Sequence, residues 1–146
     1  MPIRTARFAE LEARTMYELL RLRCTTFVVE QHCAYLDLDG RDLEPETVHL
    51  WCDQDGTPVT YLRVLREQDG SARIGRVCTA ATHRGKGYAG TLVTAALALI
   101  GPAGCRIEAQ AQLVDYYARF GFVVSGLEYL EDDIPHVPMH RDAPSP

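Results

Sequence analysis

The 146-residue sequence lacks a surplus of basic residues and lacks a long apolar run, and each absence excludes a class of function. Fifteen Lys and Arg stand against twenty Asp and Glu, for a formal net charge of −5. Proteins that bind duplex nucleic acid use basic surfaces to neutralise phosphates, so no nucleic-acid partner is expected. The most apolar stretch, 89–100, is too short and too interrupted by Thr and Gly to span a bilayer, so no membrane partner is expected.

The cysteines lack the pairing expected of a secreted or redox-active protein. There are five of them, an odd number, and no C-x-x-C occurs. Three lie in stretches that are predicted to be buried strands, where a reduced cysteine acts as a small apolar residue. The N-terminal residues 1–14 mix Arg and Glu and contain no apolar signal core. We therefore expect a cytoplasmic protein with reduced thiols.

Motifs for a metal or a serine nucleophile are also missing. The segment 37–40 has the Asp-x-Asp-Gly spacing of a calcium loop, but Val48 stands where that loop requires glutamate. His136 and His140 are four residues apart, but prolines between and beside them exclude the helix that would align them on one metal. No G-x-S-x-G occurs. We expect no metal cofactor.

The middle of the chain predicts an antiparallel meander. The runs 48–53, 58–66 and 72–80 are strand-like, and Asp-Gly pairs separate them. Asp-Gly between apolar runs is a strong hairpin signal. The preceding segment 30–47 is the longest irregular stretch and contains three aspartates, so it is predicted to be a functional loop.

The remaining pattern predicts a single α/β (α+β) domain over 1–146. A short strand at 3–8 and an amphipathic helix that includes Met16 and Leu19 precede the loop. A helix over 87–100 and a strand over 105–111 follow the meander. The order predicts a mixed, mostly antiparallel sheet of about six to seven strands with helices on both faces. Later come a short helix with an apolar face around 113–120, a final strand pair at 122–125 and 137–140, and a frayed tail at 142–146.

A glycine-rich turn, Arg84-Gly85-Lys86-Gly87-Tyr88-Ala89-Gly90, is the most informative segment. It lies between a predicted strand and a predicted helix. A helix start presents unpaired N–H groups and the positive end of the helix dipole, and glycines let a phosphate approach them closely. Two flanking cations add positive charge. The turn therefore predicts a pyrophosphate site.

The same turn also matches the dinucleotide fingerprint G-x-G-x-x-G, and Glu108 lies about 20 residues on, where a ribose-binding acid is expected. We reject that interpretation because the residues 82–84 separate the strand from the glycines. The preceding strands also form hairpins rather than β-α-β units. A Walker A loop is excluded because Thr91, not Lys, follows Gly90.

The pattern Arg84-x-x-Gly87-x-Ala89 resembles the pyrophosphate signature of the GNAT (GCN5-related N-acetyltransferase) superfamily. Tyr117 followed by Gly121-Phe122 resembles its Tyr-x-x-x-Gly-Phe element. A narrower resemblance, from about 19 to 141, is to the ElaA-like branch. It is carried by Leu22-Arg23-Cys24, Phe27-Val28-Val29-Glu30-Gln31, Tyr35-x-Asp37-x-Asp39-Gly40-Arg41-Asp42, Thr47-x-His49-Leu50, Gly75-Arg76-Val77, Ala109-Gln110-Ala111-Gln112 and Ile134-Pro135-His136.

The resemblance implies a GNAT-like fold, acetyl-CoA as co-substrate, and direct transfer of its acetyl group to a primary amine. It implies that the main chain of Val77 and Thr79 holds the pantetheine arm. Gln110 stands where many members have an Asn that contacts that arm, and its amide can make the same type of hydrogen bond. The cofactor-binding residues that it implies are Val77, Cys78, Thr79, Arg84, Gly85, Lys86, Gly87, Tyr88, Ala89 and Gln110.

Acyl transfer to an amine needs a proton acceptor for the amine and a proton donor for the leaving thiolate. Tyr117 is the candidate acid, although by periodicity alone it shares a core face with its neighbours. Glu30 is the candidate base, directly or through water, and His49 is an alternative base.

Two roles are open for the three aspartates of the loop: they attract a cationic acceptor, or they form turns. These residues are Asp37, Asp39 and Asp42. The predicted substrate-binding residues are Arg23, Gln31, Asp37, Asp39, His49 and His136.

Three other functions fit parts of the sequence. A sensor that binds acyl-CoA without turnover would keep residues 84–89 but would not need Tyr117. An acyl-homoserine-lactone synthase shares the fold, but the clear pyrophosphate turn favours coenzyme A over an acyl carrier protein. A nicotinamide-dependent enzyme is the third. The sequence identifies neither the acceptor, which is a small molecule or a peptide, nor the oligomeric state, for which a homodimer stays open.

Overall fold

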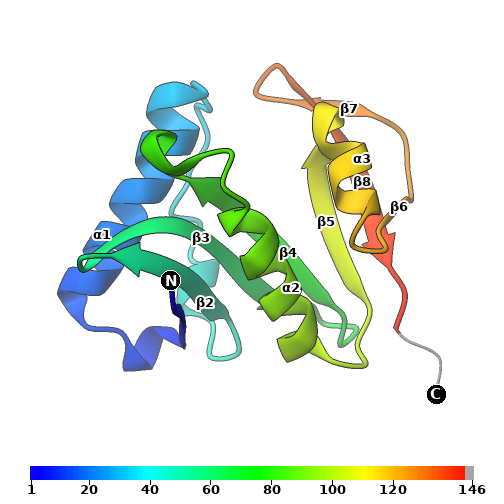
Figure 1. The fold of residues 1–146 in the computed structure, drawn as a ribbon. Coiled ribbons are helices and arrows are strands. Elements are labelled where there is room, and N and C mark those ends of the chain that lie inside the picture. The colour runs from blue at the N-terminus through cyan, green and yellow to red at the C-terminus, as the bar shows by residue number, and fades with distance from the viewer. Residues whose placement is uncertain (144–146) are drawn as a thin grey trace.

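Alternating apolar residues in the middle of the chain build a twisted sheet, which the computed structural model describes over residues 1–143 (Figure 1). Its strand order is β1-β2-β3-β4-β5-β8-β6, and β7 pairs with β8 off this path. Of the tail predicted to fray, 144–146 lie outside the described residues. The elements are β1 (Ile3–Ala6), α1 (Ala13–Arg23), β2 (Val48–Gln54), β3 (Thr57–Arg66), β4 (Ala72–Thr79), α2 (Tyr88–Ile100), β5 (Cys105–Gln110), α3 (Val114–Ala118), β6 (Val123–Val124), β7 (Tyr129–Glu131) and β8 (Ile134–Arg141).

The predicted meander is confirmed. β2 pairs antiparallel with β3, and β3 pairs antiparallel with β4. Asp55 and Gly56 both have positive φ, 52° and 82°, as a two-residue hairpin turn requires. The strand before the glycine-rich turn is thus the last strand of a meander. Within residues 1–143 the only parallel β-α-β unit is β4-α2-β5, whereas a dinucleotide-binding fold is built from two βαβαβ halves.

One pair of strands, β4 and β5, is parallel, and only the register pairs Ala72 with Cys105 and Arg73 with Arg106 join them. Beyond Arg73 the two strands diverge, because β5 continues to Gln110 and pairs on its other side with β8. The facing edges of β4 and β5 are therefore left without strand partners over most of their length. This opening in the sheet is the feature that positions the site.

The two faces of the sheet carry different helices, as predicted (Figure 1). On β2, Leu50 and Cys52 pack with α2 and α3, whereas Trp51 between them packs with α1. This alternation follows the two-residue period of a strand. No helix within residues 1–143 has both the length and the apolar character needed to cross a membrane.

The sheet has eight strands, one more than the upper end of the six to seven predicted. The additional strand is β7, only three residues long, which pairs with β8 through a turn at Asp132 and Asp133. Both aspartates have positive φ, 49° and 62°. Glycine is the usual signal for such a turn, and Asp-Asp occupies this one, so the sequence pattern gave no marker for it.

Helix α1 does not end at Arg23 but continues as a π-helix over Cys24–Glu30. The sequence predicted a second turn or short helix at 27–29, and the π-helix includes it. π-Helical turns are rare and are found mostly at functional sites. Here the π-helix carries Glu30 and the following Gln31 toward the open edge between β4 and β5.

Candidate active site

The glycine-rich turn has a backbone that only glycine adopts easily. Gly85 and Gly87 have φ of 77° and 80°, in the left-handed region that disfavours side chains. Gly87 is the N-cap of α2 and supplies no side-chain cap. Gly90, one turn further, packs against α3: a Cβ there would lie 3.2 Å from the Tyr116 hydroxyl. The first two glycines thus determine the conformation of the turn, and Gly90 allows α2 to pack closely against α3.

The start of α2 offers free donors. The first backbone hydrogen bond of the helix runs from the Thr91 N–H to the Gly87 carbonyl. The N–H groups of Tyr88, Ala89 and Gly90 therefore have no intrahelical acceptor. Lys86 is exposed beside them. This arrangement of amides, dipole and cation fits a diphosphate.

Strand β4 bulges where it leaves β5. Arg63 pairs with Gly75 and Tyr61 pairs with Cys78, so two steps along β3 face three steps along β4. Arg76 in the bulge has φ of 54°. Bulges re-aim side chains and leave main-chain groups unpaired, which suits the pantetheine role predicted for the main chain here.

The three predicted cofactor-binding residues on β4 have side chains in different surroundings. Val77 packs on the α2 face and Cys78 is buried on the α1 face. The Thr79 hydroxyl lies 3.1 Å from that of Thr60. Since the Cys78 side chain is enclosed, and burial raises the pKa of its thiol to about 12, only its main chain is available to a ligand.

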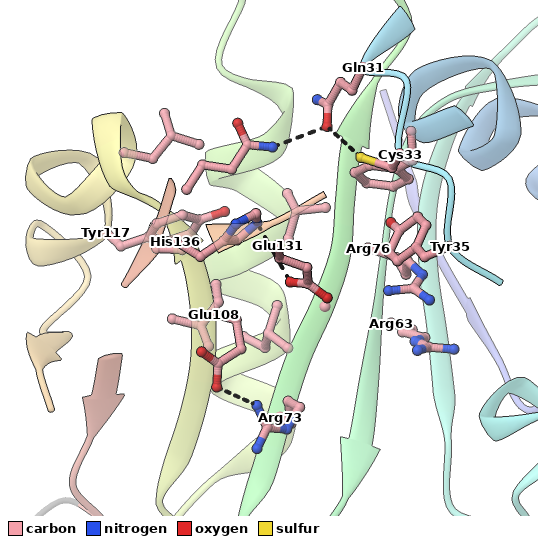
Figure 2. Close-up of a pocket in the computed structure, with 18 of the residues that line it drawn as sticks. Gln31, Cys33, Tyr35, Arg63, Arg73, Arg76, Glu108, Tyr117, Glu131 and His136 are labelled. Carbon is pink, nitrogen blue, oxygen red and sulfur yellow. Dashed lines mark hydrogen bonds and ion pairs between the residues drawn. The ribbon is translucent and has the colours of Figure 1, made fainter. Parts of the chain in front are cut away.

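A cavity of about 200 Å³ lies at the divergence of β4 and β5 (Figure 2). Figure 2 shows Tyr117 and His136 toward the β5 side and Arg76 toward the β4 side. Residues far apart in the sequence meet here. The predicted site residues that line it are Gln31, Val77, Gln110, Tyr117 and His136.

Tyr117 is enclosed but not sealed. The residue is 4% exposed and is packed edge-on between Tyr116 and Phe122, with ring centroids 5.2 and 6.2 Å away. Within residues 1–143 its hydroxyl makes no hydrogen bond, yet it is not among the buried polar atoms that lack partners. The oxygen therefore faces the cavity. Burial raises the pKa of the Tyr117 phenol, so it stays protonated and can donate.

Two adjacent residues at the C-terminal end of the π-helix, Glu30 and Gln31, contact the two parts of the predicted coenzyme site. The Glu30 carboxylate lies 2.6 Å from an Arg84 guanidinium nitrogen. The Gln110 amide donates to the Gln31 carbonyl oxygen at 3.1 Å across the opening. Glu30 does not line the cavity, so its position does not support the base predicted there; it neutralises the arginine of the pyrophosphate turn instead.

The aspartates of the predicted loop 30–47 contact buried arginines and do not line the cavity. Arg23, which is fully buried, donates to Asp37 at 3.1 Å and to Asp42 at 2.7 Å. Arg63 donates to Asp39 at 2.6 and 2.9 Å. Although burial opposes the charged form, the Arg63 contacts hold the pKa of Asp39 far below its usual range.

The substrate-binding roles predicted for Arg23, Asp37 and Asp39 are therefore not supported by their positions. These side chains form an internal ion network with one another and with Arg63 and Arg76. Asp37 lies 3.1 Å from the Arg76 guanidinium, which tethers the loop to the bulge of β4.

His49 is likewise internal. It is 0% exposed, and its ring nitrogens lie 2.7 Å from the Tyr61 hydroxyl and 3.2 Å from the Asp42 carbonyl. Burial lowers the pKa of its imidazole. It does not line the cavity, so neither the base nor the substrate-binding role predicted for it is supported by its place in the structure.

The cavity also contains residues that the sequence analysis did not select. Tyr35 lies under the Arg76 guanidinium at 4.8 Å, and burial raises the pKa of Tyr35 to about 12. Glu131 and Asp132 arrive on the β7–β8 turn. Asp132 and Asp133 form that turn without a glycine, so the sequence carries no signal that marks it.

Among residues 1–143, no group of three or more His, Cys, Asp or Glu side chains is placed to hold a metal ion. His136 and His140 lie on β8, where His136 pairs with Gln110 and His140 pairs with Arg106.

Comparisons with known proteins agree on one family. A family model described as an acetyltransferase (GNAT) domain matches residues 15–143. A UPF0039 protein of Mycobacterium tuberculosis is 52% identical over 136 residues, which covers 90% of this chain and 87% of the relative. Protein ElaA of Escherichia coli is 36% identical over 140 residues, 92% of each chain.

Solved structures show the same architecture. The crystal structure of an acyl-CoA N-acyltransferase from Pseudomonas aeruginosa superposes with a TM-score of 0.92 at 40% identity, over 96% of this chain and 98% of the other. Escherichia coli ElaA superposes with a TM-score of 0.91 at 33% identity, over 97% and 99% of the two chains. The mixed, mostly antiparallel sheet predicted from the sequence is thereby confirmed.

Proposed function

The chain belongs to the acetyltransferase (GNAT) family, and from that membership we propose that it moves an acetyl group from acetyl-CoA directly to a primary amine. Acyl transfer from an acyl-CoA is the activity that the matched family and the acyl-CoA N-acyltransferase structure support. The acetyl donor and the amine acceptor are the finer part of the proposal. Free thiols at all five cysteines support a reducing compartment, the cytoplasm.

The observation that carries this proposal is the continuity between the glycine turn and the cavity. The free amides at the start of α2 follow β4 in the chain after the short segment 80–87, and the cavity lies where β4 leaves β5. A substrate that carries a diphosphate and, at the end of a long arm, a thioester fits this arrangement, with the diphosphate at the turn and the thioester in the cavity. Acetyl-CoA is consumed there as a substrate, with its diphosphate on residues 85–89 and its arm along Val77, Thr79 and Gln110.

The chemistry at the inner end needs a proton donor for sulfur, and Tyr117 faces the cavity with a protonated phenol. An attacking amine forms the new C–N bond as the C–S bond breaks. The Tyr117 hydroxyl then protonates the departing sulfur. A cavity that holds both reactants together lowers the entropic part of the barrier.

Replacing Gly87 with Ala is expected to weaken coenzyme A binding at least about tenfold, because one lost or misaligned amide–phosphate hydrogen bond costs about 1.5–3 kcal/mol. A Cβ at Gly87 meets no protein atom within 4 Å, so it acts through the backbone or the ligand. Calorimetric titration with coenzyme A measures the dissociation constant, and release of CoA thiol from acetyl-CoA across a panel of primary amines measures turnover.

Gly56→Ala is the matched control for this experiment. Gly56 has φ of 82°, close to the 80° of Gly87, but lies in the β2–β3 turn away from the site. Both variants carry a similar backbone strain and should melt at similar temperatures. Equal coenzyme A affinity in the two variants, or no coenzyme A binding by the wild type, contradicts the proposed diphosphate site.

Replacing Glu30 with Gln is expected to tighten coenzyme A binding about two- to fivefold and to leave kcat nearly unchanged. The Glu30 carboxylate competes with the diphosphate for Arg84, and its removal frees that guanidinium. Glu46→Gln is the control, because the Glu46 side chain is exposed and makes no ion pair within residues 1–143. A large fall in kcat at unchanged coenzyme A affinity would instead restore Glu30 as the catalytic base.

A further inference from the structure

The β7–β8 hairpin brings a histidine and two acids to the cavity. Glu131 and Ile134 pair across the turn, and Tyr129 pairs with His136. The turn residues Asp132 and Asp133 both have left-handed φ, which makes the hairpin as tight as a two-residue loop allows. Glu131, Asp132 and His136 consequently line the cavity that also contains Tyr117.

The His136 ring is held in one orientation and one tautomer. Its Nδ1 lies 2.8 Å from the Ile134 carbonyl oxygen, and a carbonyl can only accept. Nδ1 therefore carries the hydrogen, and Nε2 is left with its lone pair. The ring stacks on Tyr129 at 5.8 Å, and Tyr129 is fixed by its hydroxyl, which donates to Glu108 at 2.7 Å.

The free nitrogen of His136 points toward a carboxylate. His136 Nε2 lies 3.9 Å from a Glu131 oxygen, and the His136 side chain is 13% exposed. Figure 2 shows the two side chains facing one another in the gap between the strands.

The uncompensated charge of the cavity is negative. Each of its three arginines contacts carboxylates of its own: Arg63 with Asp39 and Asp42, Arg76 with Asp37, and Arg73 with Glu67 and Glu108. Within residues 1–143, the Glu131 carboxylate has only His136 as an ionic neighbour, and Asp132 has no ion pair. The cavity thus favours a cationic occupant.

On the basis of the proposed function, we propose that His136 is the proton acceptor for the amine, and that Glu131 and Asp132 bind this amine as its ammonium. The acceptor class is then an aliphatic primary amine that arrives protonated. The other two candidate bases are occupied elsewhere: Glu30 contacts Arg84, and His49 is sealed in the interior.

The proton balance is complete without another reactant. The ammonium R–NH₃⁺ gives one proton to His136 Nε2, and the neutral amine attacks the carbonyl carbon of the thioester. The C–N bond forms and the C–S bond breaks. The sulfur takes a proton from the Tyr117 hydroxyl, which regains the second proton of the amine nitrogen. The imidazolium of His136 then returns its proton to solvent.

His136→Asn is the first test, because the Asn amide can still donate to the Ile134 carbonyl. The measurement is release of CoA thiol from acetyl-CoA with two probes, 1,4-diaminobutane, which is protonated at pH 7, and aniline, which is not. We expect kcat for the diamine to fall about 10²- to 10⁴-fold, the range for loss of a general base. Turnover of aniline should fall less than about threefold, since it needs no deprotonation before attack.

The pH profile is the second readout. The acidic limb of kcat/KM for the diamine should disappear in His136→Asn if His136 causes it. The other titratable or charged groups around this ring lie on β7 and its turn, on β5, on β4 and on α3: Tyr129, Glu131, Asp132, Glu108, Arg73, Arg76 and Tyr117. An unchanged acidic limb in the variant would assign it to one of these and overturn the proposal.

Glu131→Gln combined with Asp132→Asn tests the ammonium site. KM for the diamine should rise about tenfold, whereas KM for aniline and the affinity for coenzyme A should stay the same. Glu128→Gln should change none of these values, because Glu128 directly precedes β7, is exposed and makes no ion pair within residues 1–143.

The outcomes separate this inference from the function on which it rests. Equal losses for diamine and aniline in His136→Asn, or no loss at all, overturn the role of His136 while acetyl transfer stands. If coenzyme A binds and wild-type protein releases no thiol with any amine of the panel, the transferase proposal fails and this inference fails with it.

Discussion

Replacing Arg23 with Met is expected to lower the free energy of unfolding by about 3–5 kcal/mol, the usual cost of removing one partner from a buried ion pair. Arg23 is fully buried, and its guanidinium contacts Asp37 and Asp42, which are 4% and 5% exposed. Without Arg23, the remaining arginines leave this pair of carboxylates only partly compensated. Chemical denaturation followed by circular dichroism measures the loss.

The pH dependence of this loss provides an internal check. The contacts with Arg23 and Arg63 outweigh burial and lower the pKa of Asp42 in the folded protein. A depressed folded pKa gives stability that is present above the unfolded value, about 3.9, and is lost as the pH falls below it. The difference between wild type and Arg23→Met should therefore shrink as the pH falls below about 4.

Arg21→Met is the control on the same helix, because the Arg21 side chain is 71% exposed. It should change stability by less than about 0.5 kcal/mol. If Arg23→Met were as stable as Arg21→Met at neutral pH, Arg23 would not be the centre of an internal network. Its predicted role in binding substrate would then deserve a direct test.

Replacing Tyr117 with Phe is expected to lower kcat about 10²- to 10⁴-fold and to leave the affinity for coenzyme A within about threefold of wild type. The change removes one oxygen, which faces the cavity and makes no hydrogen bond within residues 1–143, so packing is preserved. Thiol release gives kcat, and calorimetric titration gives the affinity.

Tyr116→Phe is the matched control. Tyr116 is adjacent in sequence and packs edge-on against Tyr117, but does not line the cavity. It should keep kcat within about twofold. A Tyr117→Phe enzyme as fast as Tyr116→Phe would exclude Tyr117 as the acid and would favour protonation of the sulfur by water.

Local signals were enough to predict most of the fold. Asp55-Gly56 and Asp69-Gly70 marked the meander, and Gly101 marked the end of α2. These turns need positive φ, which glycine supplies, so sequence and geometry are tightly linked. β7 escaped prediction because Asp132 and Asp133 reach the same backbone without glycine.

The site was only partly predictable, because some of its features depend on long-range pairing. The glycine turn is local and its free amides follow from its position before α2. The roles of Asp37 and Asp39 depend on Arg63 and Arg76, which are more than twenty residues away and are placed by β3 and β4. A sequence shows three acids in a loop and does not show which arginines they meet.

The contact between Glu131 and His136 could not be predicted from the sequence for a related reason. His136 was selected through a resemblance, but its neighbour depends on the register of a hairpin that the sequence did not reveal. A shift of one residue in that register would turn the side chains to the opposite face. The sequence therefore predicted the glycine-rich turn more directly than the β7–β8 hairpin.

The short parallel pairing of β4 and β5 separates the sheet into an N-terminal half, β1 to β4, and a C-terminal half, β5 to β8. In the proposed reaction, the glycine-rich turn after the N-terminal half of the sheet binds the donor's diphosphate, and the β7–β8 hairpin of the C-terminal half binds the acceptor. Substitutions in the β7–β8 hairpin would then change which amine binds and leave the affinity for the acyl-CoA donor unchanged. A family built in this way can diversify its acceptors without reinventing how it holds the acyl carrier.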